Sequence, residues 1–358
     1  MRDRQRRRRV MVIIAGLLAV TCAVAAFAAS ARATSANMYV VHNLVSDQPG
    51  VAEHTDPNLV NAWGLTSLPA SPWWVADNGT DVSTLYQADG TPRSLVVHVQ
   101  SAPTGAASNT GSSFIVTEGA SSGPALFLFA TEEGKILGWN PTVDATHAVV
   151  AADRSSAGAI YKGLAILGNT LYAADFHNAR IDVFNGSFGL VNDAGAFVDP
   201  KLPSGYAPFG IAEIGGKIFV SYAKQDAAGE DEVAGQGLGF VDAFTPSGVF
   251  LQRLANRGQL NAPWGMALAP AGFGAFGGDL LVGNFGDGEI NAYQPQATGT
   301  YERVGALKDV DGKPILIDGL WALAFGKGTA NNGPTDTLFF TAGPDDETHG
   351  LFGTIRAG

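Results

Sequence analysis

The sequence predicts an all-β protein, a six-bladed β-propeller in which the N-terminal strand of the folded part completes the last blade. The first observation is that residues 261–295 hold three short apolar runs, PWGMALAP, GDLLVGNF and EINAYQP, separated by Gly-rich turns. Runs of this length between Gly, Pro, Asn and Asp are typical of antiparallel strands. The second observation is that the pattern recurs at intervals of about 50 residues, which is the sequence signature of a propeller. Long amphipathic helical patterns are absent, and 46 of the 358 residues are Gly, as an architecture with many tight turns requires.

Small and apolar residues mark the first strand of each predicted blade, which lies nearest the central axis. Gly is favoured there because it admits close approach of neighbouring backbones. A seventh blade would need another unit within residues 189–205 or 225–236, and neither stretch has enough apolar residues. In blades 1 to 6 the predicted first strands are found at residues 62–65, 112–117, 162–165, 208–211, 263–270 and 319–321.

The last predicted blade contains only three strands, so one strand is missing at the C-terminus. Residues 38–45, MYVVHNLV, form a spare strand without a hairpin partner nearby. We expect this strand to complete the last blade, because the ring then closes without an open sheet edge. Trp63, Trp264 and Trp321 lie at the starts of first strands, where we expect them to pack between blades, with stacking on a ligand as the alternative.

Residues 1–36 precede a predicted single propeller domain, residues 37–358, and have the pattern of a signal peptide. Six Arg within residues 2–9 are followed by an apolar segment and by Ala-Arg-Ala ending at Ala33, which fits a small-x-small cleavage site. The alternative is an uncleaved membrane anchor, since residues 10–29 are about long enough to span a bilayer. Either interpretation predicts a folded part outside the cytoplasm, secreted or at the cell surface.

The charge balance argues against some classes of partner. The chain has 22 Lys and Arg against 33 Asp and Glu, and residues 1–33 hold seven Arg and one Asp, so the remainder has 15 basic and 32 acidic residues, a net charge of −17. Such a charge repels nucleic acid and anionic membranes, and we expect neither as a partner beyond the N-terminal segment. It is compatible with calcium, with cationic ligands or simply with solubility. We expect a monomer whose partner is an extracytoplasmic ligand or protein.

Polar residues gather in the loops that lead into the first strand of a blade and in the loops between its second and third strands. Both sets of loops emerge on one face of an up-and-down blade, so these residues are expected at one mouth of the central channel. Asp and Asn are also favoured in tight turns, which is the alternative explanation for each residue taken singly. The candidate ligand-binding residues are Asn61, Asp77, Asn78, Asp175, His177, Asn261, Asn284, Asp287, Asp318, Asp345 and His349.

The same mouth could hold a metal ion. Carboxylates and amides suit calcium better than zinc, and the candidate ligands are Asp77, Asp175, Asn284 and Asp345. The sequence contains no HExxH and no Cys/His spacing, so it assigns no catalytic residue. The acidic, Gly-rich stretch 226–237 is expected to be a solvated, mobile flap in the loop between the second and third strands of blade 4, where it could act as a lid.

Several stretches resemble a family of exported bacterial proteins that form six-bladed propellers and have no established activity. These stretches are NLVSDQPGVAEHTDPNLVNAWGL (43–65), WWVADNGT (73–80), the stretch 261–293, IDGLWALAFG (317–326) and FTAGPDDETHGLFG (340–353). More distantly, VADNGT with LYQADG and AADFHNARIDVFNG resemble NHL-type repeats and, through them, metal-dependent lactonases of the gluconolactonase type. That resemblance implies a calcium ion at the channel mouth, held by Glu, Asn and Asp, although those enzymes' motifs have no residue-by-residue match here.

The sequence therefore supports two hypotheses about function. The first is an exported propeller that binds a ligand or a protein through its loop-rich channel mouth without catalysing a reaction. The alternative is a calcium-dependent hydrolase or lactonase at the same mouth, with His177 and His349 as the candidate bases. The lack of a catalytic signature favours the first.

Overall fold

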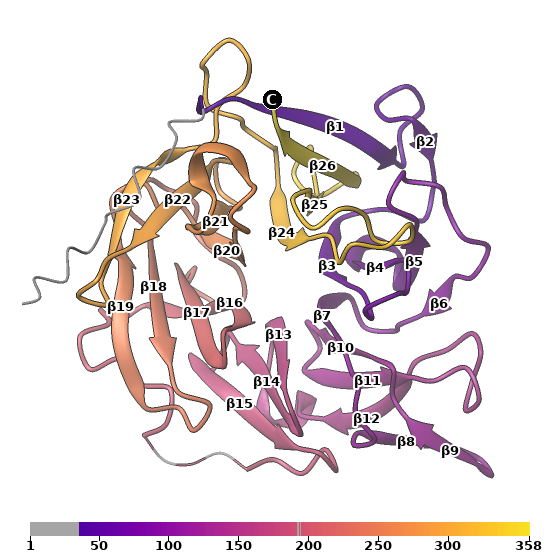
Figure 1. Ribbon diagram of the computed structural model, residues 1–358. Coiled ribbons are helices and arrows are strands. Elements are labelled where there is room, and N and C mark those ends of the chain that lie inside the picture. Colours follow the sequence, from indigo (N-terminus) through magenta and orange to yellow (C-terminus); the bar gives the residue numbers. More distant parts are fainter. Residues whose placement is uncertain (1–35, 192, 194) are drawn as a thin grey trace, which may run out of the picture. The chain divides into compact units, whose positions relative to one another are not determined.

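Six sheets surround a common axis in the computed structural model, which describes residues 36–358 except 192 and 194 (Figure 1). The predicted signal segment lies outside the described residues, apart from residue 36. Within the described part, the helical elements are three short 3₁₀ turns, η1 (Asn78–Thr80), η2 (Ser155–Ala157) and η3 (Gly274–Phe276). That part contains no helix with the length and apolar character needed to cross a membrane. The prediction of an all-β, six-bladed propeller is confirmed.

Each blade is an antiparallel sheet whose strands follow one another outward from the axis. Blade 1 consists of β3 (Ala62–Thr66), β4 (Trp73–Asp77), β5 (Val82–Tyr86) and β6 (Val97–His98), and blade 2 of β7 (Pro103–Ser108), β10 (Phe127–Thr131), β11 (Lys135–Trp139) and β12 (Val149–Asp153). Blade 3 has three strands, β13 (Tyr161–Leu167), β14 (Thr170–Asp175) and β15 (Arg180–Asn185). Blade 4 consists of β16 (Tyr206–Ile214), β17 (Lys217–Lys224), β18 (Gly239–Phe244) and β19 (Phe250–Asn256), and blade 5 of β20 (Pro263–Leu268), β21 (Leu280–Asn284), β22 (Ile290–Pro295) and β23 (Tyr301–Ala306).

Blade 6 joins the two ends of the described chain. It contains β24 (Leu320–Phe325), β25 (Leu338–Ala342) and β26 (Leu351–Ala357), and β1 (Tyr39–Ser46) pairs with β26 as the fourth strand. The short β2 (His54–Thr55) extends this sheet by pairing in parallel with β1. The predicted closure of the ring by the N-terminal strand is therefore confirmed.

The prediction for the start of blade 2 was wrong. Residues 112–117 were expected to form the innermost strand, but that strand is β7, nine residues earlier in the chain. Residues 115–118 instead form β8 (Ile115–Glu118), which pairs only with β9 (Ser121–Pro124) in a peripheral hairpin. The reason is that β7 reads PTGAAS and has no large apolar side chain, whereas FIV at residues 114–116 has the composition of a strand.

A small residue lets each inner strand approach the next blade closely. A Cβ atom at Gly210 would lie 2.1 Å from the carbonyl oxygen of Trp264, and one at Gly265 would lie 2.4 Å from that of Trp321. These distances are too short for any side chain, so the ring can close only with Gly at these positions. The corresponding residues are Gly64, Gly105, Gly163, Gly210 and Gly265 in blades 1 to 5 and Ala322 in blade 6.

The hydrophobic core lies between adjacent blades and across the axis. Separate apolar clusters fill the spaces between blades 1 and 2, 2 and 3, 3 and 4, 4 and 5, and 5 and 6. A further cluster covers the axis, where the rings of Trp63 and Trp321 stack with centroids 3.6 Å apart and Trp264 meets Trp63 edge-on at 6.2 Å. All three Trp are at most 9% exposed, which fits the packing role rather than an open stacking platform.

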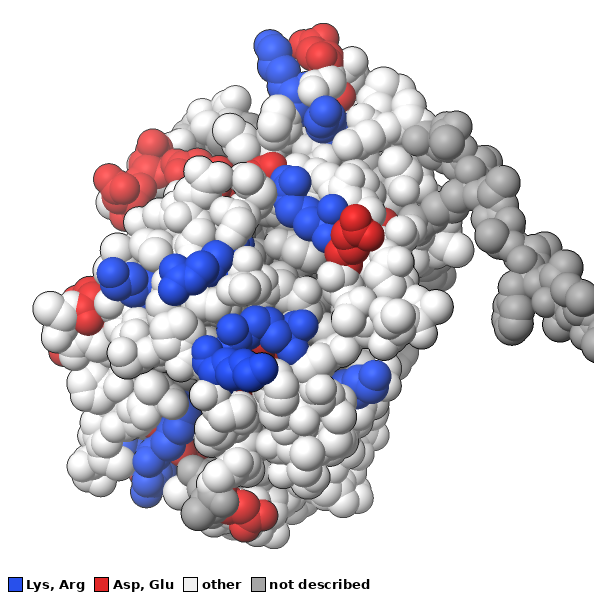
Figure 2. All heavy atoms as spheres, turned by 90° about the vertical axis from the view of Figure 1, so that its left-hand side faces the viewer, with Lys and Arg blue, Asp and Glu red and all other residues white. Residues whose placement is uncertain are grey.

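Charged side chains are spread thinly over the side of the molecule formed by blades 4 and 5. Figure 2 shows Lys and Arg there in small groups, with Asp and Glu between them and uncharged surface around them. No block of basic side chains covers this side, as a nucleic-acid-binding surface would require.

Candidate functional site

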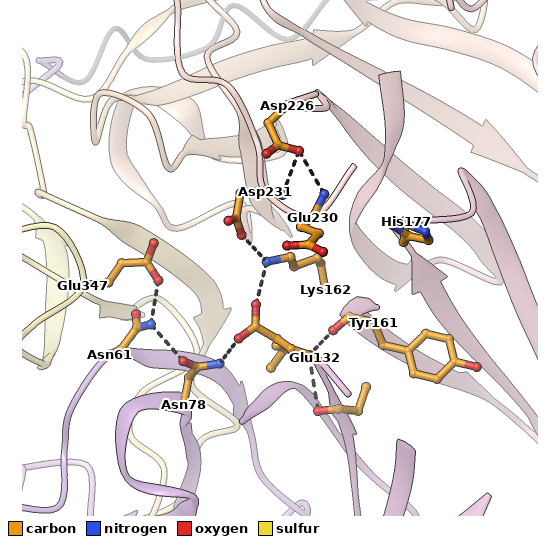
Figure 3. A network of polar contacts seen from close by, with 12 residues as sticks. Asn61, Asn78, Glu132, Tyr161, Lys162, His177, Asp226, Glu230, Asp231 and Glu347 are labelled. Carbon is orange, nitrogen blue, oxygen red and sulfur yellow. Dashed lines mark hydrogen bonds and ion pairs between the residues drawn. The ribbon is translucent and has the colours of Figure 1, made fainter. Parts of the chain in front are cut away.

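A network of polar side chains occupies the end of the channel where the inner strands begin (Figure 3). Most of it is built from the loops that lead into inner strands and from the loops between second and third strands, as the sequence predicts, while Lys162 lies in the inner strand β13 itself. Five blades contribute: Asn61 and Asn78 from blade 1, Glu132 from blade 2, Lys162 from blade 3, Asp231 from blade 4 and Glu347 from blade 6. We refer to these six residues, together with Glu232, as the polar mouth.

Lys162 is the buried centre of the polar mouth. Its side chain is 2% exposed, and its Nζ donates to Glu132 Oε1 at 2.6 Å and to Asp231 Oδ1 at 3.1 Å. The ammonium also lies 5.2 Å from the centroid of the Trp63 ring, in the range of a cation–π contact. Burial alone would lower the pKa of Lys162, but the charges of Glu132 and Glu232 outweigh it and hold that pKa above its ordinary value. Lys162 is therefore a permanent cation at neutral pH.

Two amides link the lysine to blade 6. Asn78 Nδ2 donates to Glu132 Oε2 at 3.0 Å, and Asn61 Nδ2 donates to Asn78 Oδ1 at 3.1 Å and to Glu347 Oε2 at 2.6 Å. Asn61 in turn accepts a hydrogen bond from Trp321 Nε1 at 3.0 Å, so the aromatic floor fixes the orientation of its amide. Asn61 has a φ of 47°, a left-handed conformation that Asn adopts more readily than most residues.

Two of the carboxyl groups hold their protons more tightly than usual. Burial raises the pKa of Glu232 to about 8, against the opposing charge of Lys162. Burial also raises the pKa of Glu347, although its hydrogen bond from Asn61 and the charge of Lys162 work in the other direction. The polar mouth thus contains a carboxyl group that titrates near neutral pH, beside a fixed cation.

The flap of residues 226–237 lies over this network and is held at both ends. On the side of blade 3, His177 Nδ1 lies 3.2 Å from Gly229 O. On the side of blade 5, Gly235 N donates to Asn261 Oδ1 at 2.6 Å. Between these points the flap supplies Asp231, whose side chain is 72% exposed, and Glu232. The flap therefore connects three blades and contributes two of the mouth's four carboxylates.

Some predicted residues form a second cluster beside the flap. Asn261 Nδ2 donates to Asp287 Oδ2 at 3.1 Å, and Asn284 Nδ2 donates to Asp287 Oδ1 at 3.0 Å. Asn284 Oδ1 also accepts a hydrogen bond from the backbone N of Asn261 at 3.1 Å, so the three residues are linked to one another. This cluster anchors the flap through Asn261.

The remaining predicted residues bond other partners, either within a hairpin or between loops. Asp77 and Asp175 are fully buried and accept hydrogen bonds from the backbones of Thr84 and Asn178, at 2.9 and 3.2 Å. Asp318 accepts from the backbone of Asp345 at 2.9 Å. His349 Nδ1 lies 2.7 Å from Asp47 Oδ2. Turn chemistry, the alternative explanation, describes the contacts of Asp77 and Asp175, whereas Asp318 and His349 link separate loops.

The four predicted metal ligands are not brought together. Asp77, Asp175, Asn284 and Asp345 belong to four different blades and bond different partners. Across residues 36–358, leaving out 192 and 194, no three His, Cys, Asp or Glu side chains form a group that could hold a metal ion. Each of the four residues bonds partners within its own blade, and the metal site stays a prediction.

Comparison with known proteins places the chain among relatives from a giant virus. No family model matches it. Two uncharacterized proteins of Acanthamoeba polyphaga mimivirus are each 35% identical to it, one over 329 residues, covering 88% of this chain and 79% of the relative, and the other over 333 residues, covering 88% and 85%. The chain belongs to the family of these mimiviral proteins. The expected origin in an exported bacterial family has no support among these relatives and stays a prediction.

Solved structures resemble this family in fold alone. A Bacteroides thetaiotaomicron protein of unknown function has a TM-score of 0.56 at 11% identity, with 89% of this chain and 76% of that chain covered. A streptogramin B lyase has a TM-score of 0.52 at 11% identity, with 89% and 98% covered. A putative gluconolactonase has a TM-score of only 0.41 at 16% identity, with 84% of this chain and 89% of that chain covered. This likeness is too weak to support the lactonase activity that the sequence resemblance implies.

The list of candidate ligand-binding residues leaves out Glu132, Asp231, Glu232, Glu347 and Lys162, although the sequence places the stretches containing Lys162 and Glu347 at the mouth. Glu132 follows the second strand of blade 2 in the position that Asn78 has in blade 1, so correct placement of that blade would have found it. Glu347 directly follows two Asp in the loop before β26, and all three have positive φ, between 54° and 65°. Asp231 and Glu232 lie in an insertion with no counterpart in the other blades, so only the folded structure connects them with Lys162.

Proposed function

We propose that the protein is a non-catalytic binding module that captures an organic cation, an amine, at the polar mouth. One observation carries the proposal. The carboxylates of Glu132, Asp231, Glu232 and Glu347 converge on a single cation, Lys162, and so leave an excess of negative charge. An amine would neutralise that excess, whereas an anion would meet carboxylates on every side.

The way Lys162 is bound supports an amine as the ligand class. Its ammonium is held by two carboxylates above the face of an indole ring, which is how proteins bind organic ammonium groups. Among the described residues, neither Glu232 nor Glu347 forms an ion pair within 4 Å, so both are available to a second ammonium. A calcium ion would need several carboxylates in one coordination shell.

Isothermal titration of the folded protein with spermidine tests the proposal. We expect binding that tightens from about pH 6 to about pH 9, because loss of the proton from Glu232 adds a negative charge and releases a proton on binding. The change of proton binding is measured by repeating the titration in buffers with different ionisation enthalpies. Calcium chloride and a chelator in parallel titrations test the calcium-dependent alternative.

Two conservative variants locate the site. Glu347→Gln and Glu232→Gln should each weaken spermidine binding by about tenfold, the effect of one charge-assisted contact. Glu302→Gln, on an exposed position of β23, is the matched control and should have no effect. Equal affinity in all three variants, or binding of calcium without binding of the amine, would show that the proposal is wrong.

A further inference from the structure

A cavity of about 420 Å³ lies on the axis at the end of the channel opposite the polar mouth. Its walls come from the later residues of all six inner strands, from Gly64–Thr66 in β3 round to Ala322 and Leu323 in β24. The inner strands begin at the polar mouth, so these later residues lie toward the other face. Trp264 separates the two ends: it lines the cavity, and its Nε1 donates to Lys162 O at 2.8 Å.

Apolar side chains and polar groups together line the cavity, and its size suits a small molecule. Leu65, Leu164, Ile211, Met266 and Leu323 line it, and each is 6–9% exposed. The volume falls within the range typical of small-molecule sites, which are mostly apolar with a few polar groups that fix orientation. Burial of the apolar part of a ligand against these side chains would contribute to the affinity.

The rim carries a cation without an acidic partner. Lys327, just after β24, lines the cavity, and its Nζ donates to the carbonyl oxygen of Ser67. Within the described part of the chain, Lys327 forms no ion pair, in contrast to Lys162. Glu213, which also lines the cavity, accepts a hydrogen bond from Gly216 N at 2.7 Å and forms no ion pair with Lys327. Burial lowers the pKa of Lys327, as expected for an ammonium with no carboxylate beside it.

We infer that this axial cavity binds a small molecule with an apolar body and one carboxylate, the carboxylate pairing with Lys327 and the body filling the space lined by Leu65, Leu164, Ile211, Met266 and Leu323. A carboxylate would complete the hydrogen bonding of the ammonium, since its Nζ has three donors and one is used by Ser67 O. This site lies at the other end of the channel from the proposed amine site, so the two proposals succeed or fail independently.

Octanoate is the probe, and the methyl group of Met266 is the reporter. In protein labelled with ¹³C at the Met methyl groups, octanoate should shift the Met266 signal and leave the Met38 signal unchanged, because Met266 lines the cavity and Met38 does not. Octylamine, with the same chain and the opposite charge, should not compete. Absence of a Met266 shift up to about millimolar octanoate, or equal binding of octylamine, would overturn the inference.

Variants separate the role of the charge from that of the cavity. Lys327→Gln should weaken octanoate binding by about tenfold, while Lys313→Gln, an exposed lysine outside the cavity, should not change it. Ala106→Phe should fill the cavity and abolish binding, with circular dichroism and the melting temperature as checks on folding. If Ala106→Phe does not fold, Lys327→Gln still decides: unchanged affinity in that variant rejects the proposed pairing.

Discussion

Lys162 occupies a position that is aromatic in four of the other five inner strands. The residue before the small residue at the axis is Trp63, Thr104, Lys162, Phe209, Trp264 or Trp321 in blades 1 to 6. The aromatic members form the floor of the polar mouth, and the lysine puts a charge directly onto that floor. Burying an ammonium costs free energy unless carboxylates compensate it, so the acidic groups from blades 2 and 4 are required for this residue to fold there.

We predict that Lys162→Met destabilises the protein by about 1–2 kcal/mol at neutral pH. The variant leaves the carboxylates without their cation, but Glu132 is 31% and Asp231 is 72% exposed, so solvent screens much of the loss. The loss should shrink near pH 5, where the carboxyl groups with raised pKa values are neutral. Denaturant unfolding at both pH values measures the loss, with Lys135→Met, which removes the partner of the exposed Glu133, as control. A larger loss at pH 5 would contradict the explanation.

The inner strands are the elements that decide whether the ring can close. We predict that Gly210→Ala destabilises the protein by at least about 2 kcal/mol, because its Cβ would lie 2.1 Å from a backbone oxygen that cannot move without shifting the next blade. Gly272→Ala is the matched control, since the nearest atom to its Cβ would be 3.8 Å away. Thermal unfolding of both variants should therefore give clearly different melting temperatures.

The strand β1 holds the ring shut through Tyr39. The Tyr39 ring packs on Phe273 with centroids 4.8 Å apart, and its hydroxyl accepts a hydrogen bond from Phe276 N at 3.2 Å. We predict that Tyr39→Ala costs about 3–5 kcal/mol, the usual cost of deleting a buried aromatic side chain. Val40→Ala, at a 48% exposed position on the same strand, should cost less than about 0.5 kcal/mol. Similar losses in both variants would mean that the strand, rather than the Tyr39 contacts, closes the ring.

The elements differ in how far the sequence predicts them. The sequence predicts five inner strands and the closing strand because their apolar residues face two neighbouring blades. It does not predict β7, because small residues are sufficient in that strand where its neighbours fill the space. The loops containing Asn61 and Asn78 are correctly placed at the mouth. Asp77 and Asp175 were misleading, because the same residue types that bind ligands also satisfy turns. Asp231 could not be placed, since its contact with Lys162 spans 69 positions in the chain.

At the scale of the whole molecule, function and stability are separated along the axis. Packing between blades is apolar and continuous, while the charges that are expensive to bury gather at the mouth and inside the blades. The aromatic floor divides the channel into the polar mouth and the axial cavity. Each end has its own lysine: Lys162 at the polar mouth is paired with carboxylates, whereas Lys327 at the cavity bonds only a carbonyl oxygen among the contacts described. This difference is the physical basis for the two proposed sites.

Stability should fall as the pH rises from about 5 to about 9. Burial raises the pKa of Glu232 and of Asp242 to about 8, and the charge of Asp199 adds to the effect at Asp242, while Arg253 opposes it. Between the ordinary pKa of a carboxyl group and about 8, the folded state therefore holds protons that the unfolded state releases. Folding is favoured by those protons at the acidic end of this window, and that stabilisation is lost as the pH passes through the raised pKa values.

The variant Glu232→Gln should flatten this dependence. Gln carries no charge at either end of the window, so the variant should gain about 1 kcal/mol relative to the parent near pH 9, a rise of about 2 °C in Tm, and gain nothing near pH 5. Melting curves recorded across the window measure the difference, with Glu302→Gln as the exposed control. If Glu232→Gln instead lost stability near pH 9, the Glu232 carboxylate would be a net stabilising partner of Lys162. Its charge would then stabilise the fold and would not be available to a ligand.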